Sequence, residues 1–183
     1  HHGTSLHTKL NASQWEQLLT TTKAIFGVNK IALQLANKTF QKQCSLEKYI
    51  QIDNAITPLR KIDNFQPKNN CKVFVFVGRI CKEKGVLNLI KAFKLVENPY
   101  SKLIVIGGAG AKGKVTLETS YIADCKSFVK ENNLNVTFTG FLSGDDLLPK
   151  LLEADAMIMS TDTRHYQEGM PLAILEAFSL GLP

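Results

Sequence analysis

Two glutamates eight positions apart flank a Gly-Met-Pro turn in EGMPLAILEAFSLGLP, residues 168–183. Pro171 suits the first helical position, so Glu168 is expected in the loop just ahead of a helix whose free N–H groups form an anion site. Glu176 then lies more than a turn inside that helix, which its apolar neighbours predict to be largely buried. A buried carboxylate is costly unless it accepts hydrogen bonds, and a ribose diol would supply the donors. The other interpretation places Glu176 on a solvated helix face, since exposure is the default for glutamate.

Arg79 and Lys84 are a second pair of side chains whose types suit a particular chemistry. Both lie in FVGRICKEKG, residues 76–85, where Arg79 follows an expected strand end at Gly78 and Lys84 precedes Gly85. Arginine forms forked hydrogen bonds to phosphate oxygens and lysine supplies a mobile point charge, so the two are complementary at a diphosphate. The sequence has no Asp-x-Asp motif and no His/Asp cluster that would hold a metal. Taken alone, the KEK stretch also fits a solvated turn.

Three further segments with recognisable motifs precede the paired glutamates in the sequence. They are FVGRICKEKG (76–85), LIVIGGAG (103–110) and VTFTGFLSGDDLLPKLLEADAMIMS (136–160). Together with the E-x7-E segment they resemble the retaining glycosyltransferases of the family 4 type. The resemblance implies the carboxyl-terminal, nucleotide-sugar-binding half of a GT-B enzyme. It also implies transfer from a UDP- or GDP-sugar with retention of configuration, through a front-side displacement in which the leaving phosphate helps to accept the acceptor proton, without an obligatory metal or cofactor.

The resemblance carries roles onto individual residues of this sequence. Arg79 and Lys84 would stabilise the departing diphosphate in place of a metal, and Glu168 would bind donor-sugar hydroxyls; these three are the expected catalytic residues. Glu176 would bind the ribose. The backbone around Phe141 would bind the edge of the base, while the ring of Phe141 is expected to pack in the core. The other expected donor-binding residues, all in turns or at a helix start, are Gly78, Gly108, Leu142, Gly169, Met170, Pro171 and Leu172.

These residues need a scaffold of parallel strands joined by crossover helices. Short apolar runs alternate with helical patterns along residues 71–183, which predicts an α/β fold with a Rossmann-like, doubly wound parallel sheet. Ligands of such sheets bind at the carboxyl ends of the strands, where the Gly-Arg, Gly-Gly-Ala-Gly and Thr-Gly-Phe segments fall. The expected strands span residues 72–77, 102–106, 135–139 and 155–159.

The first third of the chain is expected to be the end of a preceding acceptor domain. Its expected elements are a helix at 11–23, a strand at 24–28, a helix at 29–43 and a strand at 48–52. The predicted domains are a truncated acceptor domain at 1–56, a polar linker at 57–70 and a donor-binding domain at 71–183, truncated at its carboxyl end. Both ends of the chain look cut, so this stretch alone is expected to bind nucleotide sugar without turnover.

Two nucleotide-binding motifs and one other class of function compete with this interpretation. GAGAKG, residues 108–113, has the spacing of a dinucleotide fingerprint, but the next expected strand closes with Thr139-Gly140 and lacks the acidic residue that such a site needs. GAGAKGKV fits a phosphate loop except at Val115, which cannot ligate magnesium. An NAD-binding protein and a P-loop protein are therefore disfavoured. A non-catalytic module that binds nucleotide sugars is the remaining alternative.

Composition bounds the partners of the protein. Of the formal charge of +6, a share of +5 lies in residues 1–70, which carry nine Lys/Arg and four Asp/Glu. A solvated basic helix face explains this excess, and attraction to an anionic membrane that carries a lipid-linked acceptor is the sharper hypothesis. This basic region lacks the interleaved aromatic residues that would indicate nucleic-acid binding. The four cysteines lack zinc-like pairing and are interpreted as reduced and structural.

The expected location follows from the same features. No apolar run reaches the roughly 18 residues that a membrane span needs, and no signal peptide is visible. A cytoplasmic enzyme, with peripheral contact at the inner membrane face as an option, is predicted. The resemblance implies a glycan or lipid-linked acceptor and a role in cell-envelope polysaccharide or lipopolysaccharide biosynthesis.

Overall fold

The computed structural model describes residues 10–28, 31–40, 48–57, 72–110, 115–162 and 169–183. The chain divides into two compact units, the first made of residues 1–55 and 167–172 and the second of residues 56–166 and 173–183. The first unit thus includes a short segment from the sequence range expected for the donor-binding domain. The predicted linker lies almost wholly outside the described residues, and the domain boundaries stay a prediction.

The described residues of the first unit form two helices and a two-stranded parallel sheet. Its elements are α2 (Ala12–Thr21), β1 (Ile25–Gly27), α3 (Ile31–Phe40) and β2 (Tyr49–Gln51), each inside its predicted range. Asn11 caps α2, since its side chain accepts from the Gln14 N–H while the Gln14 side chain accepts from the Asn11 N–H. Trp15 and Tyr49 are buried together at the centre of this unit.

In the second unit, the residues that the structure describes form a four-stranded parallel sheet. Its strands are β3 (Val73–Val77), β4 (Lys102–Ile106), β5 (Val136–Gly140) and β6 (Ala156–Met157), in the spatial order β5-β4-β3-β6. The chain starts at β3, moves outward through β4 to β5, and then returns to the other side of β3 with β6. This reversal of direction makes the boundary between β3 and β6 a topological switch point.

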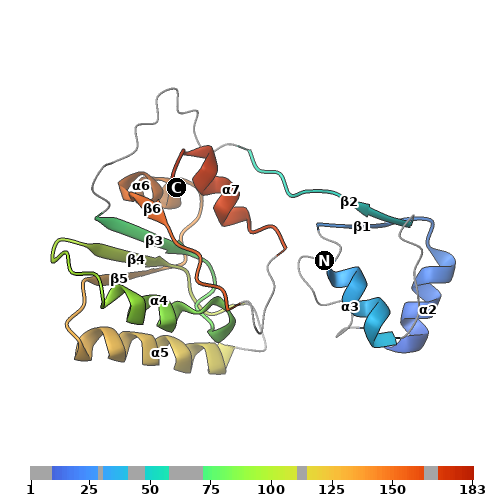
Figure 1. Ribbon diagram of the computed structural model, residues 1–183, viewed down its shortest axis with the longest axis horizontal. Helices are drawn as coiled ribbons and strands as arrows, with labels where there is room; N and C mark the ends of the chain where they lie inside the picture. Colours follow the sequence, from blue (N-terminus) through green and yellow to red (C-terminus); the bar gives the residue numbers. More distant parts are fainter. Residues whose placement is uncertain (1–9, 29–30, 41–47, 58–71, 111–114, 163–168) are drawn as a thin grey trace. The chain divides into compact units, whose positions relative to one another are not determined.

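Helices cover both faces of this sheet (Figure 1). One face carries α4 (Val86–Phe93) and α5 (Val115–Glu131), and the other carries α6 (Leu147–Glu153) and α7 (Leu172–Ser179). Alternate strand residues serve the two cores: Val75 and Ile104 pack toward α6 and α7, while Phe76 and Leu103 pack toward α4 and α5. Strands buried on both faces read as continuous apolar runs. The predicted doubly wound parallel sheet is therefore confirmed.

The last predicted strand is shorter than expected, because β6 covers only two residues of the predicted range 155–159. Asp155, at its start, is buried and uses its carboxylate to accept hydrogen bonds from the N–H groups of Lys72 and Val73, both at 2.8 Å. A side chain thus satisfies two backbone N–H groups at the beginning of β3.

The described cysteines fit the structural role predicted for them. Cys81 and Cys125 are buried and unoxidised. Burial raises the pKa of the Cys81 thiol, and burial raises the pKa of Cys125 to about 11. Both thiols are therefore protonated at neutral pH, which makes them poor nucleophiles. Cys44 and Cys71 lie outside the described residues. In the described part of the chain, no helix is both long and apolar enough to cross a bilayer.

Candidate functional site

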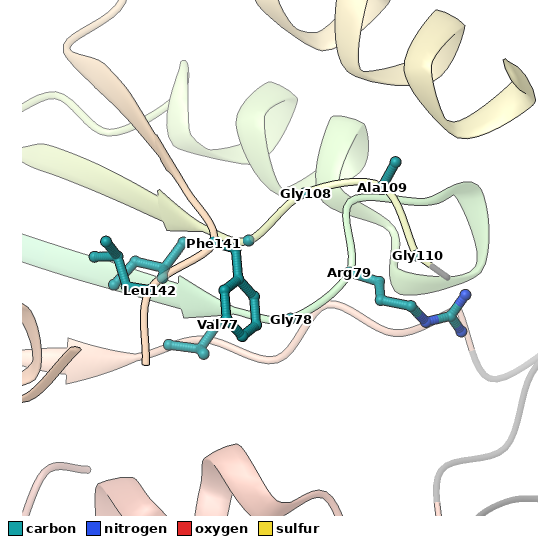
Figure 2. A pocket seen from close by; sticks show the side chains of 10 residues that line it. Val77, Gly78, Arg79, Gly108, Ala109, Gly110, Phe141 and Leu142 are labelled. Carbon is teal, nitrogen blue, oxygen red and sulfur yellow. The ribbon is translucent and has the colours of Figure 1, made fainter. Parts of the chain in front are cut away.

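A cavity of about 410 Å³ opens at the carboxyl ends of three neighbouring strands in the second unit (Figure 2). It is lined by residues 77–79 after β3, residues 106–110 after β4 and residues 141–142 after β5. Cavities that bind small ligands commonly have volumes of about 300–1,000 Å³. The expected catalytic residue Arg79 lines it together with four of the expected donor-binding residues, Gly78, Gly108, Phe141 and Leu142.

At Gly107, which lines this cavity, the backbone segments that follow β3, β4 and β5 are close to one another. The Gly107 N–H donates to the carbonyl of Gly140 at 2.8 Å, and the N–H of neighbouring Gly78 donates to the carbonyl of Ile106 at 3.0 Å. Gly107 has φ of +135°, and a Cβ placed there would collide with the carbonyl oxygen of Gly78. Only glycine fits this crossing of three strand ends. The sequence prediction named Gly108 and missed Gly107; the pair of glycines directly after an apolar strand was the available signal.

Gly108 has the opposite surroundings. A Cβ built there has no heavy atom within 4 Å, so the residue exposes its backbone to the cavity. Its carbonyl accepts from the N–H of Ile80 at 2.9 Å, which ties the turn after β4 to the turn after β3. A ligand can therefore approach this backbone closely.

Arg79 is exposed at one end of the cavity. Figure 2 shows its side chain extending away from the ring of Phe141, on the side of the cavity where the turn from Gly108 to Gly110 runs. The glycine turn and the guanidinium bring backbone groups and a fixed positive charge to the same end of the cavity.

Lys84 is not among the residues that line the cavity. It ends a short 3-10 helix, Lys82–Lys84, and its carbonyl accepts from the Ser160 hydroxyl at 2.8 Å. Gly85 follows with φ of +65°, and a Cβ there would collide with the carbonyl oxygen of Ser160. The turn that carries Lys84 is thus held against the segment after β6, on the β6 side of β3 and at the topological switch point.

Phe141 corrects one expectation from the sequence. Its side chain is 81% exposed, so the prediction that the ring packs in the core is wrong. The ring stands beside Gly78 at the cavity (Figure 2). Leu142, the next residue, is partly buried and packs against the core beneath α6 and α7. The physical reason is the turn after β5, which sends one side chain of this apolar pair outward and the other inward.

Glu176 lies on α7 as predicted, but the helix is less buried than expected. Among its residues only Ala177 is buried, and Phe178 is largely exposed. The Glu176 side chain is partly buried, and this burial raises its pKa. Among the described residues, its carboxylate has no hydrogen-bond or ion-pair partner. A partly buried carboxylate without a hydrogen-bond donor beside it is suited to bind a ligand that donates hydrogen bonds.

The rest of the predicted site is not among the residues that line this cavity, or lies outside the described residues. Glu168 is outside the described residues. Gly169, Met170 and Pro171 are partly buried, and Leu172 is exposed at the start of α7. These four residues belong to the first unit, whereas the cavity belongs to the second. No group of three His, Cys, Asp or Glu side chains able to hold a metal is found among the described residues.

The position of the glycine turn also bears on the dinucleotide alternative. A dinucleotide fingerprint belongs to the first strand-to-helix turn, beside the switch point. Here the motif that starts at Gly108 follows β4, one strand further from the switch point than β3. Its residues 111–114 lie outside the described part of the chain. The topology therefore agrees with the sequence in disfavouring this alternative.

Comparison with known proteins gives a family and curated relatives. The family described as Glycosyl transferases group 1 matches residues 60–183. An uncharacterized glycosyltransferase of Methanocaldococcus jannaschii is 29% identical over 181 residues, which cover 96% of this chain and 36% of that protein. The UDP-Gal:alpha-D-GlcNAc-diphosphoundecaprenol alpha-1,3-galactosyltransferase of Escherichia coli is 32% identical over 121 residues, or 63% of this chain and 28% of the relative. The chain spans about a third of the length of these two relatives.

Solved structures show the same fold. Anabaena Alr3699/HepE, in complex with UDP and glucose, aligns with a TM-score of 0.72 over 100% of this chain and 50% of its own, at 18% identity. The apo form of the lipopolysaccharide outer core galactosyltransferase WaaB aligns with a TM-score of 0.60 over 90% of this chain and 43% of its own, also at 18% identity. The predicted fold class, the carboxyl-terminal half of a GT-B fold, is confirmed.

Proposed function

This chain belongs to the glycosyl transferases of group 1. From this premise, we propose that it takes part in the transfer of a hexose from a nucleotide-diphosphate sugar to a glycan or lipid-linked acceptor. The transfer retains anomeric configuration and needs no obligatory metal. It serves cell-envelope polysaccharide or lipopolysaccharide assembly at the cytoplasmic face of the membrane. The observation that carries the donor half of this proposal is the cavity that gathers Arg79, the glycine turn and Phe141.

The two ends of the cavity suit the two ends of a nucleoside diphosphate. Arg79 and the open backbone at Gly108 offer a forked cation and close approach, which phosphate oxygens require. Phe141 offers an exposed ring on which a base can stack, and the backbone beside it offers polar groups to the base edge. In this arrangement the base lies over the end of β5 and the diphosphate over the ends of β3 and β4.

The remaining predicted residues complete the proposed site. Lys84 supplies a second cation to the departing diphosphate, and Glu168 binds hydroxyls of the donor sugar. Glu176 accepts from the ribose hydroxyls, and the backbone from Gly169 through Leu172 contacts the donor at the start of α7. Support for Glu176 comes from its partly buried carboxylate, which has no partner among the described residues.

The relatives support the choice of donor and acceptor. Solved neighbours were crystallised with UDP and with UDP-glucose, and the Escherichia coli relative is named for a UDP-sugar donor and a diphosphoundecaprenol-linked acceptor. We therefore expect UDP to bind more tightly than GDP. Peripheral contact with an anionic membrane surface is the proposed use of the basic excess in residues 1–70.

Calorimetric titration of the chain with UDP, GDP and ADP tests the donor proposal. Binding of UDP or GDP in preference to ADP supports a nucleotide-sugar site. If no nucleotide binds, the proposed function fails. If binding occurs but the protein that contains this chain transfers no sugar to any lipid-linked or glycan acceptor, the alternative of a non-catalytic binding module gains support.

Phe141→Ala is expected to weaken binding of UDP and of uridine to the same degree, by about 1–3 kcal/mol, because the lost stacking involves the base and not the phosphates. Calorimetry with both ligands measures the effect. Tyr100→Ala is the matched control, because Tyr100 is also highly exposed but precedes β4, at the amino ends of the strands. If the Phe141 variant binds uridine as the unaltered chain does, the base lies elsewhere.

Glu176→Gln is expected to stabilise the fold slightly at neutral pH while weakening nucleotide binding. Burial raises the folded-state pKa of Glu176 above its unfolded value of about 4.3, so folding favours the protonated form. The contribution of Glu176 to the free energy of unfolding is fully present below about pH 4. It is lost as the pH rises through the pKa that Glu176 has in the folded protein. The variant avoids that loss, and its melting temperature should exceed the unaltered one at pH 7 but not at acidic pH. Thermal melts across pH, each with and without UDP, measure both effects.

Glu153→Gln is the control of opposite sign for this experiment. Hydrogen bonds from Lys102 and Lys150, at 2.8 and 2.9 Å, lower the pKa of Glu153. Its stabilising contribution is present above the unfolded pKa and lost as pH falls through the folded one. This exposed variant should lose a little stability at neutral pH and leave UDP binding unchanged. A Glu176 variant that behaves in the same way would contradict the ribose role.

A further inference from the structure

Asn54 makes a hydrogen bond that joins two distant parts of the sequence. Its side-chain Nδ2 donates to the backbone carbonyl of Met170 at 2.6 Å, across 116 residues of chain. Both residues are partly buried and both belong to the first unit. The partner of Asn54 lies in the turn that leads into α7.

The position of Asn54 is itself well defined. It follows β2, which pairs in parallel with β1, and the backbone pairing continues past the strand because the Ile52 N–H donates to the Gly27 carbonyl at 3.0 Å. The Gln51 side chain also donates to the carboxylate of Asp53 at 3.1 Å. The side-chain amide of Asn54 therefore lies just after a strand end that hydrogen bonds hold in place.

The accepting carbonyl is a critical point of the turn. It belongs to the peptide bond between Met170 and Pro171, which has no N–H, so this oxygen is its only polar backbone group. Holding the oxygen restricts rotation within Met170, and the proline ring restricts its own φ to about −65°. Together these two restraints set the direction in which the chain enters α7 at Leu172.

We propose that Asn54 is a positioning residue for the donor site, acting through the turn from Gly169 to Pro171. The inference rests on the proposed function, in which this turn and the start of α7 contact the donor. Asn54 holds the turn in its binding geometry before the donor arrives, so less ordering is needed on binding.

The contact itself can be observed without any ligand. Met170-Pro171 is the only Met-Pro pair in the sequence, so labelling with carbonyl-¹³C methionine and ¹⁵N proline isolates one carbonyl resonance. Asn54→Ala should move this resonance in the direction of a lost hydrogen bond. An unchanged resonance would show that the bond is absent in solution and would overturn the inference.

The functional role is tested by UDP binding to Asn54→Ala and Asn54→Asp over a range of pH. Both variants should bind UDP about three- to tenfold more weakly than the unaltered chain at neutral pH. An ionised carboxylate cannot donate, but a protonated one can. Asn54→Asp should therefore regain affinity, relative to the unaltered chain at the same pH, as the introduced carboxyl group becomes protonated. Asn54→Ala should not.

Asn132→Asp is the matched control. Asn132 makes the same kind of bond, from its Nδ2 to the Phe128 carbonyl at 2.8 Å, in a partly buried position after α5. It should lose stability without losing UDP affinity. Unchanged UDP affinity in both Asn54 variants, beside normal binding by the unaltered chain, would overturn the positioning role alone. Absence of binding by the unaltered chain would remove the proposed function and this inference together.

Discussion

Gly107→Ala is expected to destabilise the second unit by at least about 3 kcal/mol and to prevent folding in a marginal background. The φ of +135° is strained for any residue with a Cβ, and the added carbon would meet the carbonyl oxygen of Gly78. That oxygen belongs to backbone at the end of the central strand β3. Because no flexible side chain can move aside, relief requires separating β3 from β4.

Gly108→Ala is the control for this prediction, since its added Cβ meets no atom within 4 Å. It should melt like the unaltered chain, as followed by far-ultraviolet circular dichroism during heating. It should nevertheless bind UDP less well, because the new methyl group enters the cavity that Gly108 lines. Equal melting temperatures for the two variants would contradict the close crossing of strand ends inferred at Gly107.

Arg79→Ala is expected to weaken UDP binding by about 1–3 kcal/mol, roughly five- to 150-fold, while leaving uridine binding unchanged. The guanidinium lies at the glycine-turn end of the cavity, away from the ring of Phe141. Its loss should therefore affect the diphosphate and not the base. Parallel titrations with UDP and uridine measure the difference directly.

Two further variants make the Arg79 prediction specific. Arg79→Lys keeps the charge but loses the fork, so it should recover only part of the affinity. Lys82→Ala removes an exposed cation from the neighbouring turn without touching the lining of the cavity, and should change little. If Lys82→Ala and Arg79→Ala weaken UDP binding equally, the effect is general electrostatic attraction and the proposed phosphate contact is wrong.

The scaffold of the site was predictable from local patterns. Apolar runs such as KLIVI predicted strands because a parallel strand covered by helices on both faces needs apolar residues at every position. The Gly-Arg and Gly-Gly turns after β3 and β4 were placed at the carboxyl ends of strands, and they line one cavity as expected. The start of β6 was not predictable, because the Asp155 carboxylate accepts hydrogen bonds from the Lys72 and Val73 N–H groups of a distant segment.

Within the site, the prediction was least reliable where the direction of a single side chain mattered. Phe141 and Leu142 have similar hydrophobicity, and only the turn after β5 sends the first into solvent and the second toward the core. Gly107 and Gly108 are adjacent and chemically identical. One is required by a crossing backbone and the other faces open space, a distinction that depends on β3 and not on local sequence.

The sequence by itself determined the fold class of this protein, its elements and the strand ends at which its candidate ligand groups lie, because burial and backbone conformation leave periodic and local signals in the chain. Tertiary structure alone decided which groups meet. It brought Arg79 and Phe141 to one cavity and Asn54 to the Met170 carbonyl. The physical reason is that a contact between distant segments depends on how whole elements pack, which no short pattern of residues specifies.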